Sequence, residues 1–427
     1  MAPFRPPNVE RLAAKRNVKG LTEALHHEDV LSIRIAACRA LGAIGDTRAV
    51  EPLIRALNDQ EKGVRRHAAL ALEENSASGA VGDTRAVEAL ICALTDQDGG
   101  VRQAAVSALG TIGDARAVEP LIGVLSDRDK EVRTLAARVL ALRRWVPSRG
   151  EAGASYLIAT TQWDECVRIG EAAVGPLIGA FNDSDSDMRR CAASALGAIG
   201  DARAVRQLIG GLKDQDSVVR GSAASALGTI GDARAVEPLI GALNDQVSDV
   251  RGAAASALGA IGDPRAVKPL ALTANLATSD SAVRICAIEA LGNMRANLGN
   301  TAVASLLNAL RDEGPDVIAA AARAVAHCKH PRASETLGLA LQRVEQQLAP
   351  LRSELLRLES VAHDVTAEER LAEYMDDDSP GHSTYGAAVL ERVERREQMV
   401  SIRADLQLLE VAQTALVDAI QNHGHTG

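Results

Sequence analysis

Aromatic residues are scarce in this sequence, which has 2 Trp, 3 Tyr and 2 Phe among 427 residues although 47% of the chain is hydrophobic. A core with so few rings must be assembled from Ala, Val, Leu and Ile packed at close helix spacing. A single globular core would also be unusual at this length. Both observations favour stacked units, each of which buries its apolar face against its neighbours.

The sequence also lacks long apolar runs and paired cysteines. No segment approaches the roughly 20 consecutive apolar residues that a membrane-spanning helix needs, and residues 1–8 hold no apolar stretch of signal-peptide length. The cysteines lie far apart, which indicates free thiols in a reducing compartment. They are Cys38, Cys92, Cys166, Cys191, Cys286 and Cys328. We therefore expect a cytoplasmic protein that does not bind membranes.

The net negative charge of the chain lies in its C-terminal part. Residues 335–427 hold 17 Asp and Glu against 8 Arg and no Lys, whereas the rest of the chain holds 39 residues of each sign. Nucleic-acid binding depends on a basic surface. The neutral array and the acidic tail therefore argue against a nucleic-acid partner.

One stretch of about thirty residues recurs along the chain and is clearest between Gly231 and Gly262. Apolar residues from Val236 to Leu243 and from Val250 to Ile261 follow helical spacing, so each half predicts an amphipathic helix. The glycines fit left-handed helix ends, and the Asp that follows each can cap the next helix. Pro238 lies inside the first helix and predicts a bend near its first turn.

An arginine that follows Val, Met or, at Arg34, Ile marks each unit and gives the register of the array. The intervals between these arginines are 31, 37, 31, 56, 31, 31 and 33 residues. We expect them, and the arginines of the Gly-Asp-x-Arg turns, to bridge neighbouring units by hydrogen bonds. The marking arginines are Arg34, Arg65, Arg102, Arg133, Arg189, Arg220, Arg251 and Arg284. Residues 8–25 predict an atypical helix pair that caps the array.

The recurring Gly-Asp-x-Arg-Ala-Val-x-x-Leu-Ile and Val-Arg-x-x-Ala-Ala-x-Ala-Leu-Gly-x-Ile-Gly-Asp pattern resembles the HEAT-like repeats of the phycobilisome-lyase type. The resemblance covers about residues 9–330. It implies an all-α fold, an α-solenoid of HEAT-like helix-hairpin repeats. A repeat of this kind indicates a fold strongly and a function weakly.

The two long intervals indicate insertions. The shorter one falls at residues 73–79, a polar stretch that predicts a surface loop. The longer one, at about residues 143–175, predicts an irregular helix pair and holds Trp145, Tyr156 and Trp163. Two interpretations remain open for these rings: they fill a wedge between imperfectly stacked repeats, or one stays exposed as a binding anchor.

The period of the apolar residues changes after residue 334. From Leu341 to Leu358 the apolar residues step by 3 and 4 in alternation, which is a coiled-coil heptad. After a polar break at 376–381 a second stripe begins. We expect a repeat solenoid over 1–334 and an acidic tail over 335–427 that forms a coiled-coil-like helical hairpin or a homodimer; alternatively, the first tail helix caps the solenoid.

A partner surface is predicted on the second helices of the repeats, at positions that point away from their apolar stripe. The N-terminal half places basic and polar residues there, whereas later units place Gly, Ser and Ala. The candidates are Arg39, Arg66, His67, Gln103, Arg138 and Arg190. Arginine binds carboxylates in forked geometry, so this face favours an acidic protein partner; the alternative is an ordinary solvated face.

Motifs for catalysis are missing from the sequence. There is no Gly-rich phosphate loop, no Cys-x-x-Cys and no Gly-x-Ser-x-Gly, so we predict no catalytic residue, metal ligand or cofactor. Deoxyhypusine hydroxylase, a related HEAT-like enzyme, binds two irons through repeated His-Glu pairs, whereas this chain has one such pair, His27-Glu28. Two functions remain: a non-catalytic protein-binding scaffold or, by resemblance alone, a bilin lyase or pigment-attachment chaperone.

Overall fold

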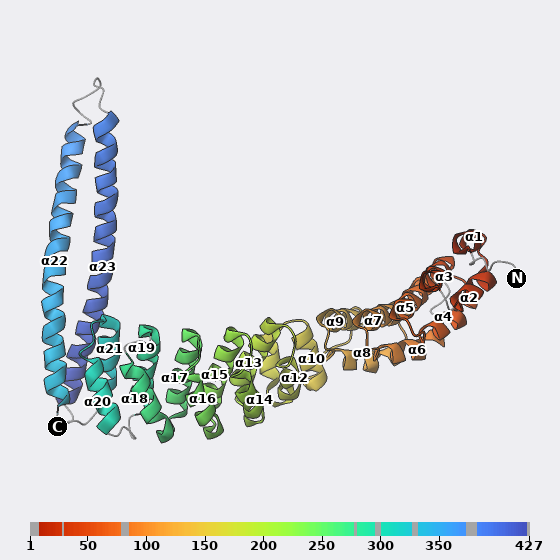
Figure 1. Cartoon of the computed structure of the whole chain (residues 1–427), viewed down its shortest axis with the longest axis horizontal. Coiled ribbons are helices and arrows are strands. Elements are labelled where there is room, and N and C mark those ends of the chain that lie inside the picture. The colour runs from red at the N-terminus through yellow and green to blue at the C-terminus, as the bar shows by residue number, and fades with distance from the viewer. Residues whose placement is uncertain are drawn as a thin grey trace. The chain divides into compact units, whose positions relative to one another are not determined.

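The computed structural model describes residues 8–27, 30–77, 85–276, 280–294, 300–326, 332–372 and 382–424, with side chains described outside 361–393 and 423–424. The described residues form helices and turns without strands. The chain divides into two compact units, Met1–Asp201 and Ala202–Gly427. In each unit, short first helices and longer second helices form two rows that can be followed in Figure 1. This is the all-α solenoid that the repeats predict.

Unit 1 begins with α1 (Val9–Ala14), which packs on the first repeat. Its first helices are α2 (Val18–Leu25), α4 (Val50–Ala56), α6 (Arg85–Ala93), α8 (Val118–Val124), α10 (Glu151–Ala159) and α12 (Val174–Ala180). Its second helices are α3 (Leu31–Ile44), α5 (Lys62–Ala77), α7 (Gly99–Ile112), α9 (Lys130–Leu142), α11 (Trp163–Ile169) and α13 (Ser186–Ile199). Short 3₁₀ turns precede three first helices: η1 (Thr47–Ala49), η2 (Ala115–Ala117) and η3 (Gly170–Ala173).

Unit 2 continues the same alternation. Its first helices are α14 (Val205–Gly211), α16 (Val236–Ala242), α18 (Val267–Asn275) and α20 (Asn300–Ala309). Its second helices are α15 (Ser217–Ile230), α17 (Ser248–Ile261), α19 (Ser281–Asn293) and α21 (Pro315–Val325). The 3₁₀ turns are η4 (Ala202–Ala204), η5 (Ala233–Ala235) and η6 (Pro264–Ala266), and two long helices follow, α22 (Ala333–Ala372) and α23 (His382–Gly424).

The predicted stop and start signals are present at the repeat boundaries. Gly231 ends α15 in the left-handed region with φ of 76°, where a side chain would be strained. The side chain of Asp232 then accepts a hydrogen bond of 2.8 Å from the backbone N–H of Arg234. Pro238 is the third residue of α16, directly after the 3₁₀ turn η5, and the bend expected there stays a prediction.

The predicted hydrogen bonds between neighbouring repeats are confirmed for most of the marking arginines and form a ladder, whereas the described hydrogen bonds of Arg251 stay within its own turn. Arg102 of α7 donates through Nε and Nη2 to Asp127, the first aspartate of the next turn, both at 2.7 Å. Both side chains are buried, at 5% and 9% exposure. The same rung recurs as Arg34–Asp59, Arg65–Asp96, Arg220–Asp245 and Arg284–Asp312. Each rung ties a second helix to the turn of the following repeat.

The two predicted insertions differ in outcome. The prediction of a loop at residues 73–79 is wrong for its described part, because α5 continues as a helix to Ala77 and its Glu73 accepts a hydrogen bond from Ser107 of α7 at 2.7 Å. The longer insertion forms the expected helix pair, α10 and α11. Arg144 and Thr161, each the residue after a helix C-cap, take left-handed φ values of 57° and 58° where glycine is usual.

The tail helices α22 and α23 pack against each other within unit 2. Arg352 pairs with Glu410 at 2.9 Å and Arg403 with Glu359 at 2.8 Å. The heptad residues from Leu341 to Leu358 are buried or half-buried. Both tail helices contact the last repeat: α23 makes the main contact with α21 and α22 makes a smaller one, so α22 is not the sole cap. Three expectations for this region stay predictions: the domain boundary at residue 334, a coiled coil, and a homodimer through 335–427. Light scattering would test the homodimer.

Candidate partner-binding groove

A groove of about 550 Å³ runs across α5, α7 and α9 in unit 1 and gathers three of the predicted partner-binding residues. Arg66, Gln103 and Arg138 come from these three helices in order, and all three side chains are exposed. They fall at equivalent turns because the repeats stack in register. Leu70 and Leu135 line the same groove and are half-buried, so polar residues stand beside an apolar floor.

The groove is basic because its arginines have no partners. Arg66 and Arg138 form no hydrogen bond or ion pair with any residue that the structure describes. Lys130, at the edge of the groove, donates to Asp185 at 3.0 Å, and this carboxylate raises the pKa of Lys130. Glu131 is the one acidic residue among those that line the groove. Two unpaired guanidinium groups thus face an open surface and can each hold a carboxylate in forked geometry.

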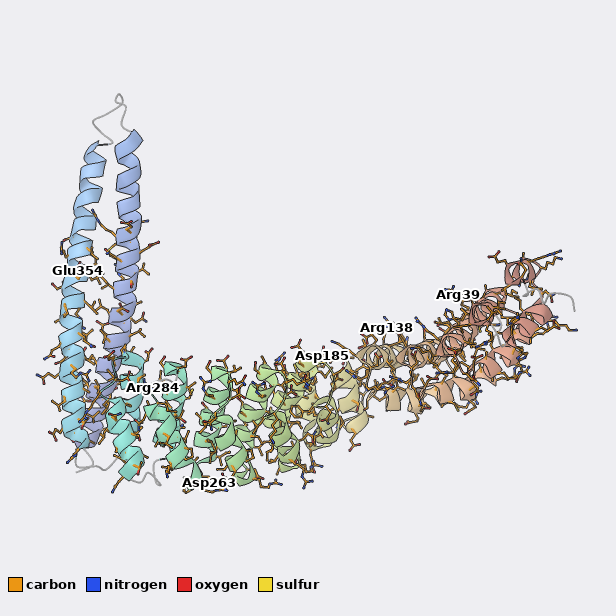
Figure 2. All side chains as sticks on the ribbon, in the orientation of Figure 1. Arg39, Arg138, Asp185, Asp263, Arg284 and Glu354 are labelled. Carbon is orange, nitrogen blue, oxygen red and sulfur yellow. The ribbon has the colours of Figure 1, made fainter. Side chains whose placement is uncertain are left out.

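The remaining candidates for partner binding lie outside this groove. Arg39 is exposed on α3, one repeat earlier, and lies on the second-helix side of unit 1 together with Arg138 (Figure 2). His67 is half-buried, and its Nδ1 lies 2.7 Å from the carbonyl oxygen of Gly63 on its own helix. Arg190 on α13 is 3.5 Å from Asp187 of the same helix. The structure thus brings Arg66, Gln103 and Arg138 together and leaves these three apart.

The three aromatic candidates are half-buried. The rings of Trp145 and Tyr156 lie 5.5 Å apart at 55°, a tilted arrangement that aromatic pairs favour, and both rings pack against the core of unit 1. Trp163 is the first residue of α11. The most exposed large apolar side chains nearby are instead Leu142 and Val146, at 77% and 79%. Leu142 ends the apolar run Val139–Leu142, which predicts core, whereas Val146 follows Arg143, Arg144 and Trp145.

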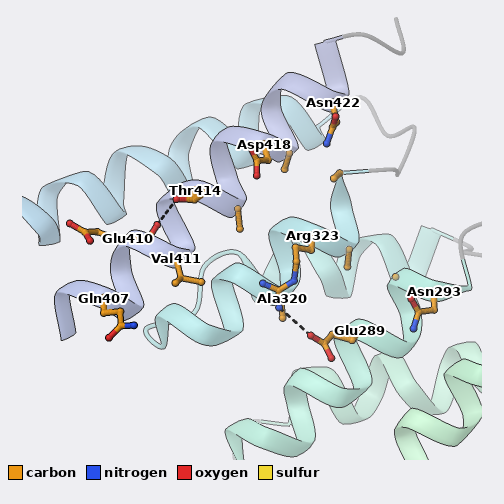
Figure 3. A pocket seen from close by; sticks show the side chains of 15 residues that line it. Glu289, Asn293, Ala320, Arg323, Gln407, Glu410, Val411, Thr414, Asp418 and Asn422 are labelled. Atoms are coloured by element: carbon orange, nitrogen blue, oxygen red, sulfur yellow. Dashed lines mark hydrogen bonds and ion pairs between the residues drawn. The ribbon is translucent and has the colours of Figure 1, made fainter. Parts of the chain in front are cut away.

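The second helices of unit 2 present a different surface. Gly221 and Ser225 on α15, and Gly252 and Ser256 on α17, stand where unit 1 has its basic side chains, and they are half-buried or exposed. A pocket of about 850 Å³ lies further along, between α19, α21 and α23, and is lined by Glu289, Arg323 and Asp418 among others (Figure 3). Arg323 donates to Glu289 at 3.1 Å, so its charge is compensated.

The described residues hold few features of other kinds of site. Among them, no group of three or more His, Cys, Asp or Glu side chains could hold a metal ion. None of the helices in the described ranges has the length and apolar character to cross a membrane. Burial raises the pKa of Cys38 to about 12 and that of Cys166 to about 11, so neither thiol ionises near neutral pH.

Comparison with protein families decides what the repeated unit is. The family of HEAT repeats matches residues 10–73, 75–141, 164–228 and 207–275. The chain belongs to the HEAT repeat family. The matched ranges of this HEAT repeat protein include the groove and every rung of the ladder except Arg284–Asp312. They confirm the resemblance that the sequence pattern predicts.

Solved structures give similar folds. Human deoxyhypusine hydroxylase is 25% identical with a TM-score of 0.27, and the match covers 67% of this chain and 99% of that one. The complex of CpcE and CpcF of phycocyanin lyase from Nostoc is 25% identical with a TM-score of 0.24, covering 60% and 92%. Yeast importin-β is 14% identical with a TM-score of 0.37, covering 95% and 52%. No curated protein matches by sequence. These likenesses carry no functional argument.

Proposed function

We propose that this HEAT repeat protein is a non-catalytic scaffold and that its groove on α5, α7 and α9 binds an acidic segment of a partner protein. The observation that carries the proposal is the contrast between two sets of arginines on the same helices. Arg65 and Arg102 are paired with aspartates inside the stack, whereas Arg66 and Arg138 are exposed and unpaired on the groove. Stacked repeats serve as extended binding surfaces in many proteins.

Chemistry and size of the groove limit what the partner can be. Unpaired guanidinium groups on separate repeats favour several carboxylates along one segment over a single anion. The apolar floor at Leu70 and Leu135 favours an apolar side chain among those carboxylates. We place the protein in a reducing, cytoplasmic compartment, because Cys38 and Cys166 are buried free thiols.

The test is capture of partners from native-host lysate by the full chain. The double variant Arg66→Glu and Arg138→Glu should lose a partner that the parent chain retains, and retention should fall as salt rises. The matched control is Arg55→Glu with Arg206→Glu, which makes the same charge change at exposed positions of two first helices. Equal capture by parent, variant and control would refute the groove. A coloured eluate with bilin absorbance would favour the lyase alternative instead.

A further inference from the structure

The groove on α5, α7 and α9 continues along α9 beyond its arginine. Leu135, Arg138 and Leu142 follow one another at intervals of three and four residues, so they lie on one face of this helix. Leu142 is one turn after Arg138 and is 77% exposed. The groove therefore leads from guanidinium groups to an exposed apolar side chain. A segment that fits it carries carboxylates and apolar residues close together.

The two unpaired arginines of the groove set the length of such a segment. Neighbouring packed helices lie about 8–10 Å apart, so Arg66 on α5 and Arg138 on α9 are roughly 16–20 Å apart across the repeats. Eleven residues span about 16 Å as a helix and up to about 36 Å when extended. A segment of about eleven residues with carboxylates at both ends is therefore long enough to reach both arginines.

The chain itself contains a segment of this composition, residues 368–378. Its sequence is Glu-Glu-Arg-Leu-Ala-Glu-Tyr-Met-Asp-Asp-Asp, with six carboxylates against one arginine. The apolar residues Leu371, Tyr374 and Met375 stand between the acidic residues at either end. Residues 376–378 are the one run of three acidic residues in the whole sequence. We call residues 368–378 the acidic segment.

The acidic segment begins on α22 and lies between the repeats' tail helices in sequence, at the end of the helical pair that is remote from the repeats (Figure 1). Within unit 2, Gln407 is the first residue of α23 that lines the pocket between α19, α21 and α23. Helix α23 begins 25 residues earlier, at His382, which corresponds to about 37 Å of helix. The ends of α22 and α23 at Ala372 and His382 therefore stand clear of these repeats and are open to another molecule.

We propose that the groove of one copy binds the acidic segment of a second copy, so that copies associate head to tail. The proposal rests on the function proposed above and names the acidic partner. Carboxylates at the two ends of the segment accept forked hydrogen bonds from Arg66 and Arg138, and an apolar residue between them packs on Leu142. This contact joins unlike surfaces, which distinguishes it from a homodimer through 335–427.

Two charge variants of the full chain test the contact by sedimentation velocity. The groove variant is Arg66→Glu with Arg138→Glu, and the tail variant is Asp376→Asn, Asp377→Asn and Asp378→Asn. The parent chain should associate more as its concentration rises and less as salt rises, whereas each variant alone should stay monomeric. Their mixture should form a one-to-one dimer and nothing larger, because it combines one intact groove with one intact acidic segment.

Three outcomes would overturn the proposal. A mixture without dimers would exclude the acidic segment as the ligand. A groove variant that dimerises alone would place the interface between the tails. A parent chain that stays monomeric while the mixture dimerises would place each acidic segment in the groove of its own copy. If the mixture forms no dimer but the groove variant still loses a partner from lysate, the groove keeps its proposed function and the acidic segment alone is refuted.

A labelled peptide of residues 366–378 tests the contact in finer detail by fluorescence anisotropy. It should bind the full chain and disperse the associated parent, and a peptide with amides in place of its six carboxylates should bind at least about tenfold more weakly. Leu142→Ser should weaken binding by about threefold to tenfold. Leu272→Ser, the matched change at a 60% exposed leucine of α18, should leave binding unchanged. Equal binding of the two peptides, or equal effects of the two leucine variants, would contradict this site.

Discussion

The second helices of unit 1 and of unit 2 share an interior and differ on their outer face. Inside, Arg102 and Arg220 hold the next turn by the same forked ion pair. Outside, α5, α7 and α9 present Arg66, Gln103 and Arg138, while α15 and α17 present Gly and Ser. Adjacent residues of one helix therefore have separate environments: Arg65 ties neighbouring repeats together, whereas Arg66 is exposed on the groove.

The difference teaches that the net charge of a repeat array does not predict its binding surface. Each charged side chain must first be assigned to the interior or to the outer face. Unit 1 and unit 2 both carry arginine at every ladder position, yet only the outward residues change the surface that a partner meets. The fields of two paired opposite charges largely cancel a few ångströms away, whereas an unpaired charge attracts groups of the opposite sign. The comparison can be tested by removing residues of each kind.

The largest effect is expected from breaking a buried rung. Asp127→Ala leaves Arg102 buried without its carboxylate, which should lower the free energy of unfolding by about 3–5 kcal/mol. Arg138→Ala, on the outward face, should change it by less than about 0.5 kcal/mol. Chemical denaturation followed by circular dichroism measures both, with the first transition compared because repeat arrays can unfold in steps. Similar losses from the two variants would erase the distinction between inner and outer arginines.

A smaller effect should separate two kinds of glycine in unit 2. A Cβ at Gly228 would lie 2.7 Å from the backbone of Ala257, so Gly228→Ala should push α15 and α17 apart and cost roughly 1–3 kcal/mol. A Cβ at Gly252 would meet only the sulfur of Cys286, at 3.6 Å, so Gly252→Ala should gain up to about 1 kcal/mol from helix propensity. Thermal unfolding of both variants measures the difference. A loss in both would mean that the outward glycines also serve packing.

The smallest effect concerns a feature that the two units share. Hydrogen bonds from Arg48 and Arg234 lower the pKa of Asp46 in unit 1 and of Asp232 in unit 2 to about 2. A carboxylate with a lowered folded pKa stabilises the fold above its unfolded pKa of about 4 and loses that contribution as pH falls toward 2. The melting-temperature deficit of Asp46→Asn or Asp232→Asn should therefore shrink over this range. A deficit independent of pH would assign the effect to capping alone.

Much of the fold could be predicted because the signals are local and repeated. Gly231 and Asp232 are read from their places at a helix boundary, and the ladder follows from an arginine that recurs at a fixed interval. The groove was predictable in part, since Arg66, Gln103 and Arg138 follow helical geometry within aligned units. The loop predicted at residues 73–79 failed because polar composition does not prevent a helix from continuing when a neighbouring helix offers Ser107 as a partner.

Other features depend on contacts between distant residues and gave no sequence signal. The packing of α23 on α21 depends on which of two apolar stripes reaches the last repeat, and periodicity alone does not choose. The turn after α10 lacks an aspartate, and Asp183, in the turn after α12, pairs with Arg133 instead. The unpaired Nη2 of Arg133 needed coordinates, because Asp183 could have come close enough for a forked pair.

The ion pair between Arg133 and Asp183 also bears on how the repeat array could have gained or lost a helix pair during evolution. The inserted pair adds 25 residues to the usual interval of 31, and the ladder crosses it without using any of its side chains. Deleting 25 residues here would return Asp183 to the separation that Arg102 and Asp127 have. The array could thus have acquired or lost this helix pair in one genetic step while its neighbours kept the same bonding partners. The inserted helix pair is thus a separate unit, because the repeats on either side of it already carry the arginine and the aspartate that pair with each other.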